Sequence, residues 1–202
     1  MIIALLLVAA YLLGAFPSSY VVARLARGID LRQHGSGNLG ATNAFRVLGW
    51  KAATPVFILD ILKGWFPTFY FPRIDQSERW EWALAYGAAA IVGHVFSIYV
   101  RFKGGKGVAT GAGVFLALAP LAVLVGLIVW GTLLFLTGTV SIASIAAAAV
   151  LPLAVALLYD ERLILVLALA LSIFVIFAHR ANIRRLLRGE EHSFRRKEAK
   201  RS

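Results

Sequence analysis

Two glycine-rich segments of the chain carry residue types that bind phosphate, and the first runs from Gly35 to Arg46. It reads Gly-Ser-Gly-Asn-Leu-Gly-Ala-Thr-Asn-Ala-Phe-Arg. Its early glycines allow positive φ and let a ligand approach backbone N–H groups closely. From about Ala41 the residues favour a helix that Gly49 would end, so Thr42 and Arg46 share one face. The segment is a candidate anion site. The plainer interpretation is a glycine turn that caps an interfacial helix.

The second segment, Phe102–Gly111, interleaves two lysines with glycines. It supplies exposed backbone donors and mobile cations, which a phosphate-cradling loop needs. It is not a Walker A sequence, because Gly107 follows Lys106 where serine or threonine would stand. His94 lies upstream in an apolar stretch, where we expect it to pack between helices. Its lysines are Lys103 and Lys106, and the glycines around them are Gly104, Gly105 and Gly107.

A third polar segment, His179–Glu190, follows the last apolar run. His179 and Asn182 are three residues apart, so they face the same way on a helix. The arginines around them could simply anchor the chain to anionic lipid. A histidine and an asparagine at the membrane boundary favour a functional site instead.

The composition determines which kind of scaffold must position these segments. The chain has 202 residues, of which 60% are hydrophobic and 15% are charged. A soluble domain of this size needs more polar surface, so a membrane protein is expected. The net charge of +11 does not indicate nucleic-acid binding, because the cations gather at the ends of apolar runs. With no cysteine, disulfides and a thiolate nucleophile are excluded.

Apolar runs of about 20 residues, enough to cross ~30 Å of hydrocarbon, predict an all-α transmembrane bundle. The predicted runs are Ile2–Leu25, Ala52–Phe71, Trp80–Val100, Gly111–Leu136, Ile142–Leu158 and Leu163–Ala178. Proline interrupts a helix, so Pro120 divides the fourth run into a short or re-entrant helix and a second helix from Leu121. About seven helical segments result. Five full spans with one non-crossing segment is the alternative.

The positive-inside rule sets the predicted orientation. Basic residues crowd the segment after the first run, the loop at Arg101–Lys106 and the tail after Ala178. These regions are therefore expected in the cytoplasm, with the N-terminus outside and the C-terminus cytoplasmic. The expected organisation is one membrane domain over residues 1–188 with a charged cytoplasmic tail over residues 189–202.

Two further features lie in or beside the apolar runs. Asp60 and Lys63 are spaced i,i+3 inside the second run, so they can pair and reduce the cost of charge near lipid. Ser141 lies at a turn on the predicted cytoplasmic side. It could cap the next helix or donate a hydrogen bond to a ligand.

Taken together, the three polar segments and the Asp60–Lys63–Gly64 element resemble the bacterial membrane-integral acyl-phosphate:glycerol-3-phosphate acyltransferase family (PlsY). The resemblance extends over nearly the whole chain. It implies acyl transfer from acyl phosphate to the 1-hydroxyl of glycerol 3-phosphate, with lysophosphatidic acid and phosphate as products, in phospholipid biosynthesis. It also implies that acyl-CoA and acyl-carrier protein are not donors, and no histidine here has the following Asp of a His-x-x-x-x-Asp dyad.

The resemblance also implies roles for individual residues. Ser36, His179 and Asn182 would lie at the reacting carbonyl. Substrate would be bound by Gly37, Asn38, Thr42, Asn43, Arg46, Lys103, Gly104, Gly105, Lys106, Gly107 and Ser141. No cofactor, metal or nucleic acid is expected, and the partners are the two substrates and membrane lipid of the bacterial inner membrane.

The proton acceptor stays open between His179 and the departing phosphate. A covalent acyl-Ser36 is a third route, but no Ser–His–acid series is visible, so direct transfer is expected. Two other classes compete with an enzyme. A transporter for a phosphorylated solute would suit the broken helices, yet its polar groups should not lie on one side alone. A non-catalytic scaffold would leave the glycine–lysine loop unused.

Overall fold

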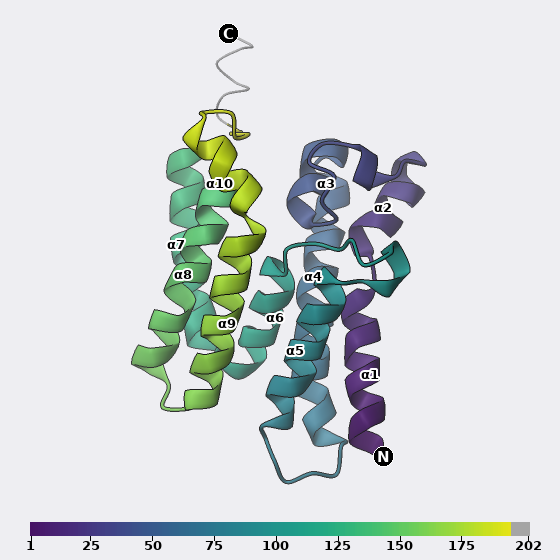
Figure 1. The fold of residues 1–202 in the computed structure, drawn as a ribbon, viewed down its shortest axis with the longest axis vertical. Helices are drawn as coiled ribbons and strands as arrows, with labels where there is room; N and C mark the ends of the chain where they lie inside the picture. The colour runs from purple at the N-terminus through teal and green to yellow at the C-terminus, as the bar shows by residue number, and fades with distance from the viewer. Residues whose placement is uncertain (195–202) are drawn as a thin grey trace. The chain divides into compact units, whose positions relative to one another are not determined.

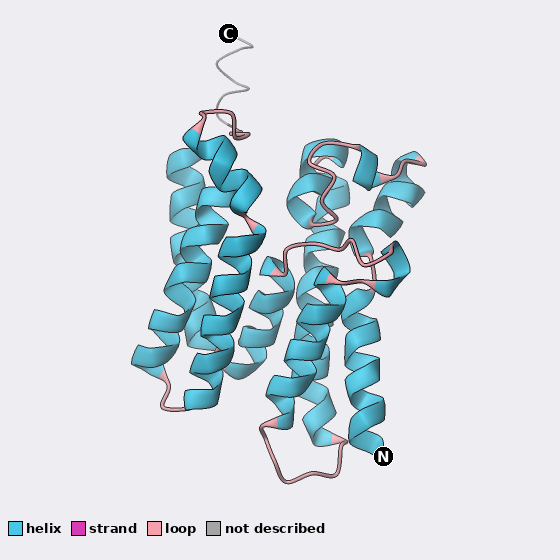
Figure 2. Cartoon of the chain, viewed as in Figure 1, coloured by secondary structure: helices cyan, strands magenta, loops and turns pink. Residues whose placement is uncertain are grey.

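The computed structural model describes residues 1–194, which form α-helices and short 3-10 helices with no strand (Figure 2). The last residues of the predicted basic tail lie outside the described residues; among them are Arg195, Arg196, Lys197, Lys200 and Arg201. Tertiary contacts divide the chain into two compact units, Met1–Leu118 and Ala119–Ser202. Each unit is described by itself.

The first unit contains six α-helices and three 3-10 helices. Their bounds are α1 (Ile2–Ala15), α2 (Ser18–Arg27), η1 (Leu31–Gln33), α3 (Ala41–Leu48), α4 (Trp50–Tyr70), η2 (Phe71–Arg73), α5 (Trp82–Val95), η3 (Ile98–Val100) and α6 (Val108–Leu118). Within this unit α1 packs on α5 and α4 packs on α6, while α2 and α3 lie at the end opposite the N-terminus (Figure 1). The loop after α5 lies toward the same end, so both glycine-rich segments gather there.

The described part of the second unit consists of three long helices and one short helix. They are α7 (Pro120–Thr137), α8 (Val140–Leu158), α9 (Arg162–Ala178) and α10 (Arg180–Leu187). Helix α8 packs against both α7 and α9 (Figure 1). Helix α6 ends at Leu118 and α7 begins at Pro120, so the predicted interruption before this proline is confirmed.

The apolar segments are those of a multi-pass membrane protein. Four helical segments within the described residues are long and apolar enough to cross a membrane, or five if the bent pair α9–α10 counts as one. These four are Ile2–Arg27, Trp82–Val100, Pro120–Thr137 and Val140–Leu158. Helix α4 is 21 residues long but is less apolar, because Asp60 and Lys63 lie in its middle.

The first apolar run is not the single helix that we expected. It breaks between α1 and α2 at Phe16–Pro17, because proline has no N–H to continue the ladder. Backbone groups freed at membrane depth must find partners inside the protein. Lys63 Nζ donates to Phe16 O at 3.0 Å, and Ser97 Oγ donates to Ala15 O at 2.5 Å. Side chains of α4 and of the α5 end thus stabilise the break.

The close contact between helices in this unit depends on glycine residues, which have no side chain. A Cβ on Gly14 would fall on the backbone of Ala90, and one on Gly93 would fall on the backbone of Tyr11. Small residues of this kind let membrane helices approach closely, where dispersion replaces the absent hydrophobic driving force. The α1–α5 contact therefore fixes where the end of α5 lies, and the loop that follows α5 starts from there.

Candidate active site

Ser36 lies in a tight loop that a buried asparagine organises. Asn43, on α3, accepts a hydrogen bond from Ser36 N at its Oδ1 (2.9 Å) and donates from Nδ2 to His34 O at 3.0 Å. Its side chain is 2% exposed, whereas Ser36 is exposed. Gly35 has φ +63°, and a Cβ there would meet the Asn43 amide. The loop thus presents Ser36 outward while Asn43 holds the backbone from behind.

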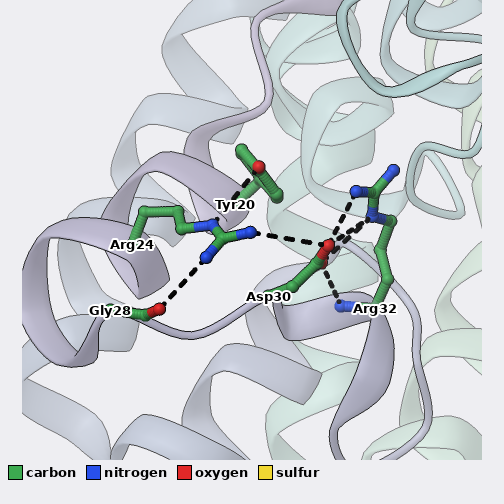
Figure 3. Close-up of polar contacts among 5 residues, drawn as sticks. All are labelled: Tyr20, Arg24, Gly28, Asp30 and Arg32. Atoms are coloured by element: carbon green, nitrogen blue, oxygen red, sulfur yellow. Dashed lines mark hydrogen bonds and ion pairs between the residues drawn. The ribbon is translucent and has the colours of Figure 1, made fainter.

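An ion-paired clasp fixes the chain just before this loop (Figure 3). Asp30 bonds the Arg32 guanidinium, with Arg32 Nη2 at 2.7 Å, and accepts from Arg32 N at 3.0 Å, which begins η1. Arg24 lies 3.9 Å from the same carboxylate, and both guanidiniums lie over the Tyr20 ring. The hydrogen bond from Arg32 lowers the pKa of Asp30 to about 2. The clasp ties η1 to α2, and Asn43 Nδ2 reaches Leu31 O of η1 at 3.4 Å.

Helix α3 carries the predicted anion ligands Thr42 and Arg46. It spans Ala41–Leu48 and ends at Gly49 with φ +86°, as the sequence predicts. Thr42 is exposed in the first turn and Arg46 is half-buried one turn later. Two predicted ligands, Gly37 and Asn38, are half-buried in the loop that leads into this helix.

The second glycine-rich segment folds back onto the end of α5. Phe102 N donates to Ser97 O at 2.8 Å, Gly104 N to Val95 O at 3.0 Å and Gly105 N to His94 O at 3.1 Å. The chain turns sharply there, because both Arg101 and Phe102 adopt the left-handed conformation, with φ +58° and +60°. Non-glycine residues in this region carry strain, which often gathers at functional sites.

The two glycine-rich segments meet within the first unit. A Cβ on Gly105 would lie 3.2 Å from Leu39 O of the first segment and would overlap the His94 ring on its other side. Gly105 therefore packs closely against the His94 side chain and the Leu39 carbonyl, and a side chain at position 105 does not fit. Lys103 is exposed beside this point, and Lys106 is half-buried. We call Gly35–Gly40 and Lys103–Gly107 the glycine loops.

In the second unit, His179 lies at the bend between α9 and α10. The two helices meet at 52°, and His179 is 4% exposed. Its Nδ1 lies 2.7 Å from Val175 O. A carbonyl oxygen can only accept, so Nδ1 carries a proton and the neutral ring has its lone pair on Nε2. That tautomer suits an acceptor of protons or hydrogen bonds at Nε2.

Asn182 and Ser141 are brought together by a residue that we did not single out from the sequence. Glu191 Oε1 accepts from Asn182 Nδ2 at 2.7 Å and from Ser141 Oγ at 3.1 Å, and Glu191 Oε2 accepts from Arg185 Nε at 2.6 Å. Ser141 therefore does not cap α8, whose N-cap residue is Thr139. We call Ser141, Asn182, Arg185 and Glu191 the Glu191 clasp.

The Glu191 carboxylate stays ionised in this setting. Burial by itself would raise the pKa of Glu191, but the hydrogen bonds from Arg185 and Asn182 outweigh it, and the pKa is lowered from its ordinary value. The following residues extend the clasp, since Ser193 Oγ donates to Thr137 O at 3.1 Å and Phe194 N donates to Gly138 O at 2.9 Å. The start of the tail thus closes over the α7–α8 turn.

Each unit brings some of the predicted residues together within itself. Ser36, Asn43 and the glycine loops meet in the first unit, and Ser141 and Asn182 meet in the second. Glu191 and Arg185 were missed. The available signal was an acidic pair, Glu190–Glu191, in an otherwise basic tail. The roles of all these residues toward substrate stay predictions.

Comparison with known proteins gives a consistent result along the chain. The family model described as glycerol-3-phosphate acyltransferase matches residues 4–189. A glycerol-3-phosphate acyltransferase of Bacillus subtilis is 46% identical over 193 residues, covering 95% of this chain and 97% of the relative. One from Geotalea daltonii is 44% identical over 191 residues, covering 95% and 97%.

Two solved structures are also similar. Both are crystal structures of PlsY, described as an integral membrane glycerol 3-phosphate acyltransferase, one in a glycerol 3-phosphate form and one in a lysophosphatidic acid form. The first has a TM-score of 0.88 at 39% identity, and the second has a TM-score of 0.85 at 38% identity. Each match covers 95% of this chain and 95% of the solved chain.

Proposed function

Because the chain belongs to the glycerol-3-phosphate acyltransferase family, we propose that it transfers a fatty acyl group from acyl phosphate to the 1-hydroxyl of glycerol 3-phosphate. The products are lysophosphatidic acid and inorganic phosphate. The observation that carries the proposal is the convergence of two glycine loops beside Lys103, in a membrane-integral chain. A phosphate substrate and a lipid-soluble acyl donor both fit such a boundary.

Glycerol 3-phosphate binds at the second glycine loop. Lys103 and Lys106 supply positive charge on either side of Gly104 and Gly105, which are half-buried and whose amides bind carbonyls of the α5 end. Gly107 completes the loop with φ +78°. Lysine suits this role as a mobile point charge.

A second anionic group is bound at the start of α3. Thr42 in its first turn and Arg46 one turn later address one phosphate, assisted by the positive end of the helix dipole. Gly37 and Asn38 lie on the approach to this helix. Asn43 and Ser141 contribute through the neighbours that they hold, Ser36 and Glu191.

The chemical step is a direct transfer. The substrate hydroxyl oxygen attacks the acyl carbonyl carbon, the bond from that carbon to the phosphate oxygen breaks, and the hydroxyl proton leaves with the phosphate or with His179. Ser36, His179 and Asn182 act at the carbonyl, where charge develops in the transition state. The Nδ1–H tautomer of His179 is consistent with acceptance at Nε2. Because acyl phosphate is already activated, positioning supplies much of the catalysis.

We place the two substrate phosphates on the cytoplasmic side of a seven-segment membrane domain over residues 1–188, with the N-terminus outside and the C-terminus, residues 189–202, in the cytoplasm. The basic loops support this orientation. Since the chain has no cysteine, single cysteines introduced at the two termini can be scored without background. One next to Met1 should react with an impermeant maleimide outside the cell, and one next to Ser202 should not. The opposite labelling would overturn the orientation.

Activity with purified protein tests the reaction. In detergent, acyl phosphate and glycerol 3-phosphate together should release phosphate and form lysophosphatidic acid, while acyl-CoA and acyl-carrier protein should give no product. Incubation with acyl phosphate alone tests direct transfer. An acyl group trapped on Ser36 would overturn that route, and absence of phosphate release with both substrates would favour a transporter or scaffold.

A further inference from the structure

We propose that His94, held by the buried Asp60–Lys63 pair, is a positioning residue for the second glycine loop and thereby sets the affinity for glycerol 3-phosphate. The inference rests on the proposed function, which assigns that substrate to Lys103–Gly107. It gives a role to three titratable groups inside the apolar part of the first unit that the acyl-transfer step itself does not use.

The loop is attached directly to the backbone around His94. Gly105 N donates to His94 O and Gly104 N donates to Val95 O, so two successive amides of the loop are tied to the last turn of α5. The imidazole supports the same point, because a Cβ on Gly105 would overlap its Nε2 and would lie 2.8 Å from its Cε1. The His94 ring thus lies directly beneath the glycines between Lys103 and Lys106.

The other side of the ring faces charge. His94 Nδ1 lies 3.9 Å from Asp60 Oδ1. The same oxygen forms an ion pair with Lys63 Nζ at 2.8 Å and accepts a hydrogen bond from Ser18 Oγ at 2.5 Å. The side chains of Asp60, Lys63 and His94 are 1%, 8% and 5% exposed. The buried carboxylate thus has neighbours from α2, α4 and α5, and it packs beside the ring, whose buried Nδ1 makes no hydrogen bond.

Burying this pair is costly, which argues for a specific use. Ionised groups inside a membrane segment are expensive even when paired, and apolar replacements of similar volume often stabilise a protein. Here the pair orients a ring whose far nitrogen reaches the substrate loop. Loss of that orientation should loosen the loop and weaken glycerol 3-phosphate binding, while binding of the acyl donor should be unaffected.

Two substitutions at His94 separate the two ring nitrogens. The amide of glutamine ends four bonds from Cα, like Nε2, and the amide of asparagine ends three bonds from Cα, like Nδ1. His94→Gln keeps a polar group near the position of Nε2 but loses the nitrogen that faces Asp60, so it should raise the KM for glycerol 3-phosphate by less than His94→Asn does. His94→Asn should raise it roughly ten-fold, the effect of losing one positioning contact, with kcat little changed.

Ser97, three residues after His94, provides a matched control. Ser97 is buried at the α5 end, and its hydroxyl bonds Ala15 O rather than the loop. Ser97→Ala should lower thermal stability and leave the KM for glycerol 3-phosphate unchanged. If Ser97→Ala and His94→Asn raised this KM equally, His94 would act through general packing, and the inference would be wrong.

The ion pair is tested by a paired replacement. Asp60→Leu alone and Lys63→Met alone should yield little folded protein, because each leaves one buried charge without its partner. The combined Asp60→Leu/Lys63→Met protein should fold but share the raised KM of His94→Asn. A folded double variant with wild-type KM would mean that the pair serves folding alone, which contradicts the inference.

Amide hydrogen exchange gives a readout without substrate. In detergent, His94→Asn should speed exchange of the Gly104 and Gly105 amides, and His94→Gln should speed it by less. Lys103→Ala distinguishes the two proposals. If Lys103→Ala raises the KM and His94→Asn changes neither exchange nor KM, the inference alone is overturned. If Lys103→Ala leaves the KM unchanged, the loop does not bind glycerol 3-phosphate, and the proposed function of the loop is overturned as well.

Discussion

The glycine loops and the Glu191 clasp both bring polar groups together, the loops through backbone atoms and the clasp through side chains. In the first unit, polar groups are gathered by backbone, since Gly104 and Gly105 donate their amides to α5 and leave no room for a side chain. In the second unit, polar groups are gathered by one carboxylate that three side chains approach.

The difference predicts different sensitivities. The glycine loops are held by backbone hydrogen bonds and not by an ionised carboxylate, so their structure should respond to added volume and hardly to pH. A site built around Glu191 should respond to charge and to pH and should accept changes in volume nearby. Substitutions in each region can therefore break or sharpen the distinction.

The largest effect is expected at Glu191. Glu191→Gln removes the charge that attracts Arg185 and weakens the bonds from Asn182 and Ser141, so kcat should fall roughly 100-fold and stability by about 3 kcal/mol. The neighbouring Glu190 is exposed, so Glu190→Gln is the matched control and should be near wild type. Activity and thermal unfolding measure both. Equal losses of kcat and stability in the two variants would contradict the role assigned to Glu191.

The same carboxylate gives a pH test. Because the folded pKa of Glu191 is lowered, its contribution to stability is fully present above the ordinary value near 4.5 and is lost as pH falls through the folded value. The difference in melting temperature between wild type and Glu191→Gln should therefore be constant near neutral pH and shrink below about pH 4.5. A difference that does not change with pH would show that charge is not what closes the clasp.

Added volume in the glycine loop should have the next largest effect. A Cβ on Gly104 would overlap the carbonyl groups of His94 and Val95, so Gly104→Ala should displace the loop and lower kcat/KM about 30-fold. Gly131, in α7, has open space around it, and alanine favours helix there. Gly131→Ala should keep full activity. Equal values of kcat/KM for Gly104→Ala and Gly131→Ala would contradict the prediction that added volume in the glycine loop displaces it.

Asn43 tests how Ser36 is held. Asn43→Asp keeps an acceptor for Ser36 N but loses both bonds that Nδ2 donates to His34 O and Leu31 O. We expect kcat to fall about ten-fold, from the loss of two hydrogen bonds, with a small change in KM. Asn43→Ala, which loses all three, should be worse. A more active alanine variant would rule out the positioning role.

The smallest effect is expected at Asp30. The clasp with Arg24 and Arg32 is near the surface, so Asp30→Asn should cost less than about 1 kcal/mol at neutral pH and leave kcat within roughly two-fold. The pKa of about 2 means that this contribution persists down to the ordinary value of 3.8 and disappears toward pH 2. Urea unfolding of the two proteins across that range measures it.

Local features of the fold were predictable from the sequence. The apolar runs after the first, the interruption at Pro120 and the helix end at Gly49 depend on neighbours in the chain, and each is found. The Asp60–Lys63 pair is also local, because a helix brings residues three apart together at 2.8 Å.

What could not be predicted depends on residues distant in sequence. Glu190 and Glu191 look alike in the tail, and the choice between them depends on Ser141, 50 residues away. Asn43 looked like a ligand, yet its amide is occupied by backbone of the preceding loop. Pro17 breaks the first run, whereas the partners that make the break tolerable come from α4 and the end of α5.

The break at Pro17 has a consequence for how the chain is made. The carbonyl of Ala15 receives its partner from Ser97, 82 residues later in synthesis, and Ser18 meets Asp60 after 42 residues. A nascent chain that has delivered its first apolar segment to the bilayer therefore holds an incomplete segment, since lipid offers no donor for that carbonyl. We therefore expect the N-terminal segment to be completed only after α4 and the end of α5 have been made.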